Sequence, residues 1–202
     1  MSNIQGELKK SIATGELKHN QLEKKLKHQH EKAALGFFKN ILSNSKAVIL
    51  LTQNNHSKEA AAIDRLAIEH LLNLAALIKN PEHLDDLEAQ SKSDIKRTLA
   101  KIVDNQKKHP SLEEELLLKA QAHLESAAST KELKANFYNI AEPSGLQDAI
   151  YDSSYRKLSA TYAHSTLATI LSSPNEDEIL EDMQSYIALG IAFLETAESV
   201  SK

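Results

Sequence analysis

Residues 60–78 read AAAIDRLAIEHLLNLAALI, and this stretch decides the fold. At about 100° per residue, its apolar side chains cover one helix face and most of the remaining circumference. The main face holds Ile63, Ala67, Leu71, Leu74, Ala75 and Ile78, and Leu66, Leu72, Ala76 and Leu77 extend it. A helix that is apolar nearly all round has to be covered by other helices. The stretch therefore predicts a central helix over 57–79.

Three polar residues interrupt this apolar helix at regular spacing. Arg65, Glu69 and Asn73 recur at i, i+4 and i+8, so they form one stripe along the helix. A buried charge without a partner is strongly destabilising. The stripe therefore predicts facing partners, either in a structural polar network or in a functional site.

The composition of the 202-residue chain favours helices. It has five Gly, four Pro and no Trp, and it lacks the β-branched and aromatic runs of strands. No Pro- or Gly-rich linker divides the chain, which predicts one all-α domain, a helical bundle with short peripheral helices, over 1–202. Residues 1–19 are expected to be loosely ordered, with a break at Gly15.

The sequence also excludes several classes of protein. It contains no Cys, which excludes disulfides, thiolate metal sites and a Cys nucleophile. No apolar run approaches the roughly 20 residues of a membrane-spanning helix. The first residues, MSNIQGELKKS, lack the apolar core of a signal peptide. A cytoplasmic protein without a membrane partner is expected.

The net charge of −4 is unevenly distributed along the chain. Residues 1–46 hold nine Lys and four Glu. The basic part, KKLKHQHEK, is interpreted as the solvated face of an amphipathic helix in preference to a phosphate-binding surface. Lys and Glu are mixed in this region, and it has no interleaved aromatic residues for stacking on bases.

Capping residues and prolines predict the helix boundaries. Asn80-Pro81 ends the central helix, and the sequence Ser173-Pro174-Asn175-Glu176 starts the last one. The first long helix, 20–53, is one helix or two joined near Gly36 or Ser43–Ser45. The other predicted helices are 57–79, 81–90, 94–107, 111–127, 129–140, 146–162 and 174–199, with a loop at 142–145.

Nine His raise the question of a metal site. On a helix, His28 and His30 would point about 200° apart and could not share one ion. Glu16 and His19 have the Glu-x-x-His spacing of di-iron bundles, but those centres need a second such pair, which the chain lacks. No nucleotide-binding or hydrolase motif occurs. The sequence predicts no metal and no cofactor.

A hydroxyl-rich helix face lies within residues 151–166, YDSSYRKLSATYAHST. Residues at i, i+4, i+8 and i+11 share this face, namely Tyr151, Tyr155, Ser159 and Tyr162. The face could complement the Arg65 stripe, and His164 follows where the helix weakens. Hydroxyls that satisfy a buried Arg–Glu pair are the favoured interpretation, and a binding or catalytic site is the alternative.

These residues resemble a known pattern. Arg65-x-x-x-Glu69-x-x-x-Asn73 together with Tyr155-x-x-Leu158-Ser159-x-x-x-x-His164 resembles an uncharacterised bacterial all-helical family, a domain of unknown function similar to the HEPN superfamily. The layout matches over residues 35–195. The resemblance implies a helical bundle, often dimeric, of the kind found in ribonuclease toxins, abortive-infection proteins and partners of nucleotide transferases.

In HEPN ribonucleases, four to six residues separate an Arg from a His. The resemblance implies that Arg binds phosphate and that His is the acid/base of RNA cleavage. In this chain seven residues separate Arg156 from His164.

Two functional hypotheses follow. The first is a helical domain that acts through a protein partner or as a homodimer, in bacterial phage defence or a toxin–antitoxin-like system. The second is a metal-independent ribonuclease in which His164 is the general acid/base and Arg156 or Arg65 holds the phosphate of RNA. The interval between Arg156 and His164 places the first hypothesis ahead.

Overall fold

The computed structural model describes residues 3–108, 113–126, 137–162 and 171–200. Within them every regular element is a helix and none is a strand, which confirms the all-α fold class. Contacts divide the chain into two compact units. Unit 1 is Met1–Pro81 with Phe137–Lys202, and unit 2 is Glu82–Asn136. The single domain over 1–202 stays a prediction.

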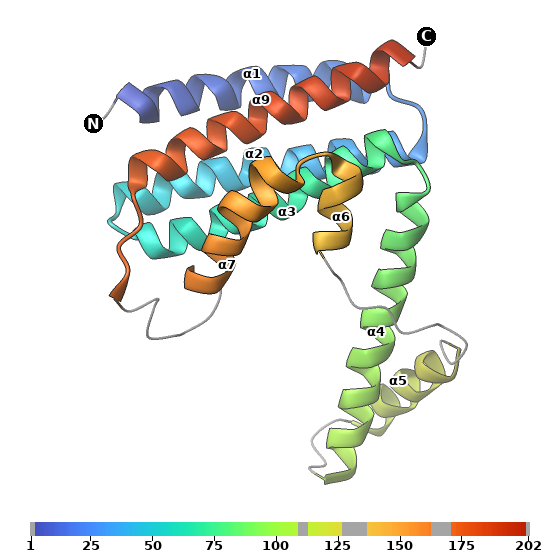
Figure 1. Cartoon of the computed structure of the whole chain (residues 1–202). Coiled ribbons are helices and arrows are strands. Elements are labelled where there is room, and N and C mark those ends of the chain that lie inside the picture. The colour runs from blue at the N-terminus through green and yellow to red at the C-terminus, as the bar shows by residue number, and fades with distance from the viewer. Residues whose placement is uncertain (1–2, 109–112, 127–136, 163–170, 201–202) are drawn as a thin grey trace. The chain divides into compact units, whose positions relative to one another are not determined.

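Four long helices form the body of unit 1: α1 (Asn3–Glu23), α2 (Gln29–Gln53), α3 (Ser57–Lys79) and α9 (Glu176–Val200). In Figure 1, α1 lies along α9 and α2 lies along α3. Helix α3 also contacts α9, and α2 contacts both α1 and α9, so the four helices enclose one core. The predicted boundaries of α3 agree with the structure, and those of α9 differ by two residues at most.

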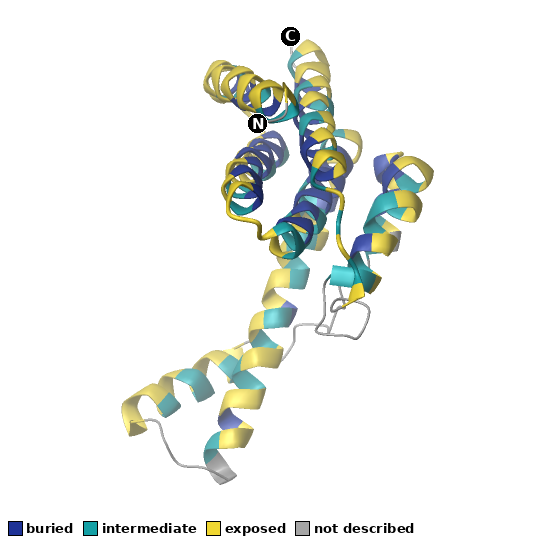
Figure 2. Ribbon diagram, turned by 90° about the vertical axis from the view of Figure 1, so that its left-hand side faces the viewer, coloured by how far each residue is buried: buried dark blue, intermediate teal, exposed yellow. Residues whose placement is uncertain are grey.

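The core is centred on α3. Every residue from Leu71 to Leu77 is buried, as expected for a helix with neighbours on all sides. Figure 2 shows that buried residues line the inward-facing sides of the long helices. Phe38 of α2 is fully buried in this core, and α9 approaches it closely at Gly190. A Cβ atom at Gly190 would lie 2.6 Å from Phe38 Cδ2, so a larger residue there would displace the ring.

The N-terminal segment differs from the expectation of a loosely ordered stretch. It forms the continuous helix α1, in which Leu8, Ile12 and Leu22 are buried. Gly15 is not a break, because α1 continues through it. It lies at a close contact with α2, where a Cβ atom would be 2.6 Å from Leu42 Cδ2. The absence of a side chain at this position lets α1 lie against α2, so packing and not local propensity holds this helix.

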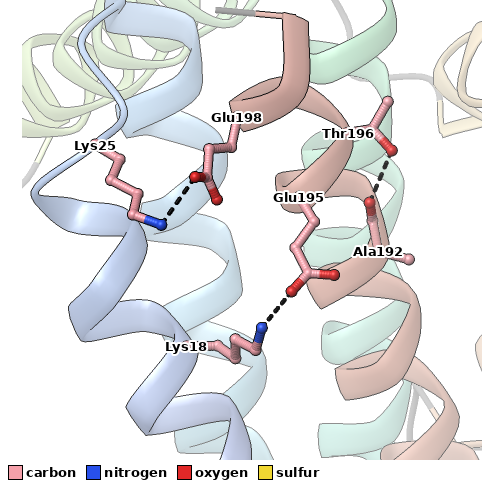
Figure 3. A network of polar contacts seen from close by, with 6 residues as sticks. All are labelled: Lys18, Lys25, Ala192, Glu195, Thr196 and Glu198. Carbon is pink, nitrogen blue, oxygen red and sulfur yellow. Dashed lines mark hydrogen bonds and ion pairs between the residues drawn. The ribbon is translucent and has the colours of Figure 1, made fainter. Parts of the chain in front are cut away.

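Two ion pairs link the α1 region to α9, as Figure 3 shows. Lys18 pairs with Glu195, and Lys25, just after α1, pairs with Glu198 at 2.8 Å. Thr196 Oγ1 donates to the carbonyl oxygen of Ala192 within α9 at 2.9 Å. Such exposed pairs contribute little stability, so burial of the apolar face accounts for most of the packing of α1.

The predicted helix 20–53 is interrupted at 24–28, not at Gly36 or Ser43–Ser45. Buried Glu31 stabilises the new start, because its Oε2 accepts hydrogen bonds from the backbone N–H groups of Lys27 and His28 at 2.9 and 3.0 Å. His28 therefore precedes the helix. Its ring stacks on that of His30 at 5.7 Å, which corrects the prediction that the two rings point apart.

The segment beside α3 comprises α6 (Phe137–Ser144), η1 (Gln147–Tyr155) and α7 (Arg156–Tyr162). The loop predicted at 142–145 is confined to a turn at Gly145, whose φ is +72°, and Pro143 lies within α6. The predicted α-helix 146–162 begins instead as the π-helical η1. In η1 the N–H of Tyr151 donates to the carbonyl of Leu146, five residues back, at 3.2 Å.

Unit 2 contains α4 (His83–Lys108) and α5 (Glu114–Ser126), which contact each other. Helix α4 runs through the predicted boundary between 81–90 and 94–107, because Ser93 is a buried residue within it and not a cap. The predicted caps Ser111 and Ser129 lie outside the described residues. Among the described helices, none has the length and apolarity that a bilayer crossing needs.

Candidate functional site

The polar stripe on α3 forms a three-residue network with η1. Arg65 Nη1 pairs with Glu69 Oε1 one turn along the same helix. Tyr155, the last residue of η1, donates its hydroxyl hydrogen to Glu69 Oε1 at 3.1 Å and lies 3.4 Å from Arg65 Nη1. The side chains of Arg65 and Glu69 are only 21 % and 16 % exposed. The two charges therefore neutralise each other in a half-buried position.

Aromatic contacts hold Tyr155 in this network. Its ring stacks on Tyr151 with centroids 5.1 Å apart and lies 5.6 Å from the ring of Phe137. The Arg65 guanidinium carbon lies 5.6 Å from the centroid of the same ring. Burial, and next the Glu69 carboxylate, raise the pKa of the Tyr155 hydroxyl, so it stays protonated and donates.

The other predicted site residues have different surroundings. Asn73 Nδ2 donates to the backbone carbonyl of Glu69 at 2.9 Å, and Ser159 lies half-buried on α7. Arg156 is exposed and pairs with Asp152 at 3.1 Å. His164 lies outside the described residues. The structure thus brings together Arg65, Glu69 and Tyr155, while the catalytic roles of His164, Arg156 and Arg65 stay predictions.

A pocket of about 170 Å³ lies beside this network, between α3, the η1–α7 segment and the start of α9. Asp64, the residue before Arg65, is the only residue of α3 that lines the pocket. The remaining lining residues are Ser153, Ser154, Lys157, Leu158, Tyr162, Pro174, Asn175, Glu178, Ile179 and Asp182. Three carboxyl groups and one ammonium group thus share this small space.

Asp64 is the unusual member of the pocket. Its residue is 1 % exposed, and neither of its carboxyl oxygens has a hydrogen-bond partner in the described part of the chain. The buried hydroxyl of Tyr186 on α9 also has none. The phenol and the carboxyl are close enough to affect each other's pKa, but they form no hydrogen bond of normal geometry. Buried polar groups rarely lack a hydrogen-bond partner in this way.

The surroundings of Asp64 oppose its ionisation. Burial, and next the charge of Asp182, raise the pKa of Asp64 to about 8. Burial, and next Glu178, raise the pKa of Asp182 to about 6. Lys157 forms its ion pair with Glu178, at 3.0 Å. At neutral pH Asp64 therefore holds a proton that a bound ligand could displace, and such perturbed acids in a concave site mark a functional candidate.

Sequence reasoning did not single out Asp64, although a signal was present. The neighbours at three and four residues on either side, Ala60, Ala61, Ala67 and Ile68, are all apolar. An acidic residue surrounded in this way lies on the apolar face of its helix and not in the polar stripe.

A second candidate is the surface of unit 2. Ile95 and Ile102 of α4 are 56 % and 37 % exposed, and their seven-residue spacing places them on one face. Leu116 and Leu118 of α5 are also exposed and point about 200° apart around that helix. No residue of α5 is buried. We call these four side chains the unit 2 apolar surface.

Comparison with known proteins places most of the chain in one family. A family model described as a family of unknown function, DUF5677, matches residues 31–179. This region includes Asp64, the Arg65 network and all of unit 2. No curated protein and no solved structure matches the chain. Among the described residues, no group of three or more His, Asp or Glu side chains is arranged to hold a metal ion.

Proposed function

The chain belongs to DUF5677, a family of unknown function, and we propose that it is a helical domain that acts through protein contacts made by unit 2. Its first partner is a second copy of the same chain. The observation that carries this proposal is the unit 2 apolar surface, Ile95, Ile102, Leu116 and Leu118, exposed on both helices.

Two helices alone cannot enclose a core. In the described part of unit 2 the buried residues are His83, Ser93 and Val103, and only Val103 is aliphatic. A second pair of helices would cover one face of α4, with Ile95 and Ile102, and one face of α5, with Leu118, and complete a four-helix arrangement. Two-fold symmetric dimers are the commonest way in which identical chains supply such a pair.

Charge favours the same pairing. Residues 92–108 contain six basic and two acidic residues, whereas residues 113–126 contain four acidic residues and one Lys. In a two-fold arrangement, α5 of each copy can lie against the basic half of α4 of its partner. Opposite charges would then meet around the apolar contacts and fix their register.

Size-exclusion chromatography with light scattering measures the mass of the protein in solution and tests this proposal. Wild type should have twice its chain mass of 22.4 kDa. The double variant Ile95→Lys/Leu118→Lys should elute as a monomer with unchanged helical circular dichroism. Leu50→Lys is the matched control, because Leu50 of α2 is as exposed as Leu118 but belongs to unit 1. A monomeric wild type, or equal dissociation by the control, would contradict the proposal.

The cellular setting proposed for this domain is cytoplasmic and bacterial, in phage defence or a toxin–antitoxin-like system. It rests on the similarity to the HEPN superfamily carried by Arg65, Glu69, Asn73, Tyr155 and Ser159 with His164. Neighbouring genes that encode toxins or defence proteins would support it, and housekeeping neighbours would oppose it.

A HEPN-like ribonuclease is the second candidate. Its support is positional: Tyr162, two residues before His164, lines the pocket together with Lys157. The described lining of the pocket, however, holds Glu178 and Asp182 beside a Lys that is already paired, which disfavours the phosphates of RNA even while Asp64 is protonated. This electrostatic mismatch and the seven-residue interval between Arg156 and His164 rank the nuclease second.

Cleavage of single-stranded RNA in EDTA separates the two candidates. The nuclease predicts metal-independent cleavage that His164→Ala abolishes, while the exposed control His56→Ala keeps it. We expect no cleavage by wild type. Cleavage that is lost only in a well-folded His164→Ala protein would reverse our ranking.

A further inference from the structure

The described residues that line the pocket between α3, η1–α7 and α9 include three with carboxyl groups and one with an ammonium group. Among the described residues that line it, Lys157 is the only basic one, and it forms an ion pair with Glu178. In the described part of the chain, no basic side chain forms an ion pair with Asp64 or Asp182. Asp64 is also buried and has no hydrogen-bond partner among those residues. A cationic group with N–H donors would satisfy these oxygens and offset the excess of carboxyl groups.

We propose that this pocket binds a small organic cation, a primary amine or a guanidinium, whose N–H groups donate to the carboxylates of Asp64 and Asp182. This inference goes beyond the dimerisation of unit 2 and is independent of it. The pocket volume of about 170 Å³ equals the share of about five or six water molecules in the liquid, which suits such a ligand.

The rest of the pocket fits the same chemistry. The hydroxyl of Tyr162 and the side-chain oxygen of Asn175 can accept further hydrogen bonds from an ammonium or guanidinium group. Leu158 and Ile179, both largely buried, supply apolar surface for a short hydrocarbon stem. An anion would find three carboxyl groups and a Lys already engaged, so the pocket selects for positive charge.

Binding is coupled to a proton. Burial and the carboxyl groups of Asp182 and Glu178 on α9 disfavour ionisation of Asp64, and Tyr186 of α9 and Lys157 of α7 offset this only in part. The pKa of Asp64 is about 8 without ligand, so at pH 7 the bound cation has to displace its proton. Affinity should rise by up to about tenfold per pH unit towards pH 8, because one proton is released per ligand.

Titration calorimetry of the full chain with n-butylamine and methylguanidine at pH 8 tests the proposal. Both cations should bind, and n-butanol, a neutral molecule of similar size, should bind at least tenfold more weakly. Asp64→Asn and Asp182→Asn should each weaken butylamine binding at least tenfold. Asp177→Asn, which removes the same charge from an exposed position on α9 outside the pocket lining, should change it less than twofold.

Proton release gives an independent readout. At pH 7, heats measured in buffers of different ionisation enthalpy should show about one proton released by wild type and none by a folded Asp64→Asn protein. Failure of both cations to bind at pH 8, equal binding of butylamine and butanol, or an equal loss in Asp177→Asn would each overturn the proposal. None of these outcomes would alter the oligomeric state on which the dimerisation proposal rests.

Discussion

Asp64 and Arg65 are neighbours on α3, yet their electrostatic surroundings differ completely. Arg65 pairs with Glu69, and Tyr155 completes the network with a hydrogen bond. Asp64 is more deeply buried and has no hydrogen bond within the described residues. A turn of about 100° around the helix separates them, so Arg65 faces η1 whereas Asp64 faces the pocket beside α9.

This difference distinguishes a structural device from a functional candidate. The Arg65 network satisfies its own charges, which is how buried polar groups are normally accommodated. The carboxyl of Asp64 destabilises the fold whenever it ionises, because burial opposes its charge. A position that lowers stability without a compensating contact fits a role in ligand binding.

The largest expected effect is on the pH dependence of stability. Asp has a pKa of about 3.9 in unfolded chains, whereas that of Asp64 in the folded protein is about 8. Between these values only the folded state holds the proton. The stabilisation that protonated Asp64 gives the folded state is therefore complete below about pH 4. It is lost as pH rises towards 8, and the free energy of unfolding falls by up to about 1.4 kcal/mol per pH unit.

Urea unfolding of wild type and Asp64→Asn between pH 5 and 8 measures this effect. The difference between the two proteins isolates Asp64 from other titrating groups, including His70 and His83, whose pKa values burial lowers. Asp64→Asn should become progressively more stable than wild type as pH rises. Parallel curves for the two proteins would show that Asp64 is ionised and satisfied in the folded state.

The sequence predicted those parts of the fold that have local signals. The boundaries of α3 and α9 follow from Asn80-Pro81 and from the cap at Ser173-Pro174, because the effect of proline on the backbone is local. The extent of α1 did not follow. Its contacts with α2 and α9 stabilise it, and Gly15 looks like a helix breaker until the close approach of Leu42 is known.

The candidate site also has a part that local spacing predicts and a part that it does not. The meeting of Arg65 with Glu69 follows from i, i+4 spacing, which is local. The pocket combines Asp64 with Asp182, 118 positions later in the chain, and no periodicity reveals which distant helix faces a given residue. The π-helical start of η1 does not follow from spacing either, because the polar residues of 146–162 recur at α-helical intervals.

The second largest effect should come from breaking the network. Glu69→Ala leaves the half-buried guanidinium of Arg65 without its ion-pair partner. Breaking a fully buried ion pair costs about 3–5 kcal/mol of stability, and breaking an exposed one costs about 0–1 kcal/mol. Because the Arg65–Glu69 pair is half-buried, the free energy of unfolding should fall by about 2 kcal/mol.

Asp152→Ala is the matched control for Glu69→Ala. It breaks the ion pair with Arg156, which has the same i, i+4 spacing on an exposed surface, and should cost less than about 0.5 kcal/mol. Equal losses in the two variants would show that the Arg65 network faces water.

A smaller effect is expected for Tyr155→Phe. The change removes the hydroxyl that donates to Glu69 but keeps the ring that stacks on Tyr151. Denaturant unfolding should show a loss of about 1 kcal/mol, the net value of one hydrogen bond to a charged acceptor that stays paired with Arg65. A loss above about 3 kcal/mol would mean that the ring itself has been displaced.

The smallest effect, and the sharpest contrast, is expected for Tyr186→Phe. Here the same atom is removed from a hydroxyl that is buried but has no hydrogen-bond partner in the described part of the chain. Removing an unsatisfied polar atom lowers the cost of burial, so the free energy of unfolding should stay within about 0.5 kcal/mol of wild type or rise. If Tyr186→Phe instead destabilised the protein as much as Tyr155→Phe, the phenol would have to donate to Asp64. The acid would then be a satisfied part of the core, and the contrast between the two sides of α3 would disappear.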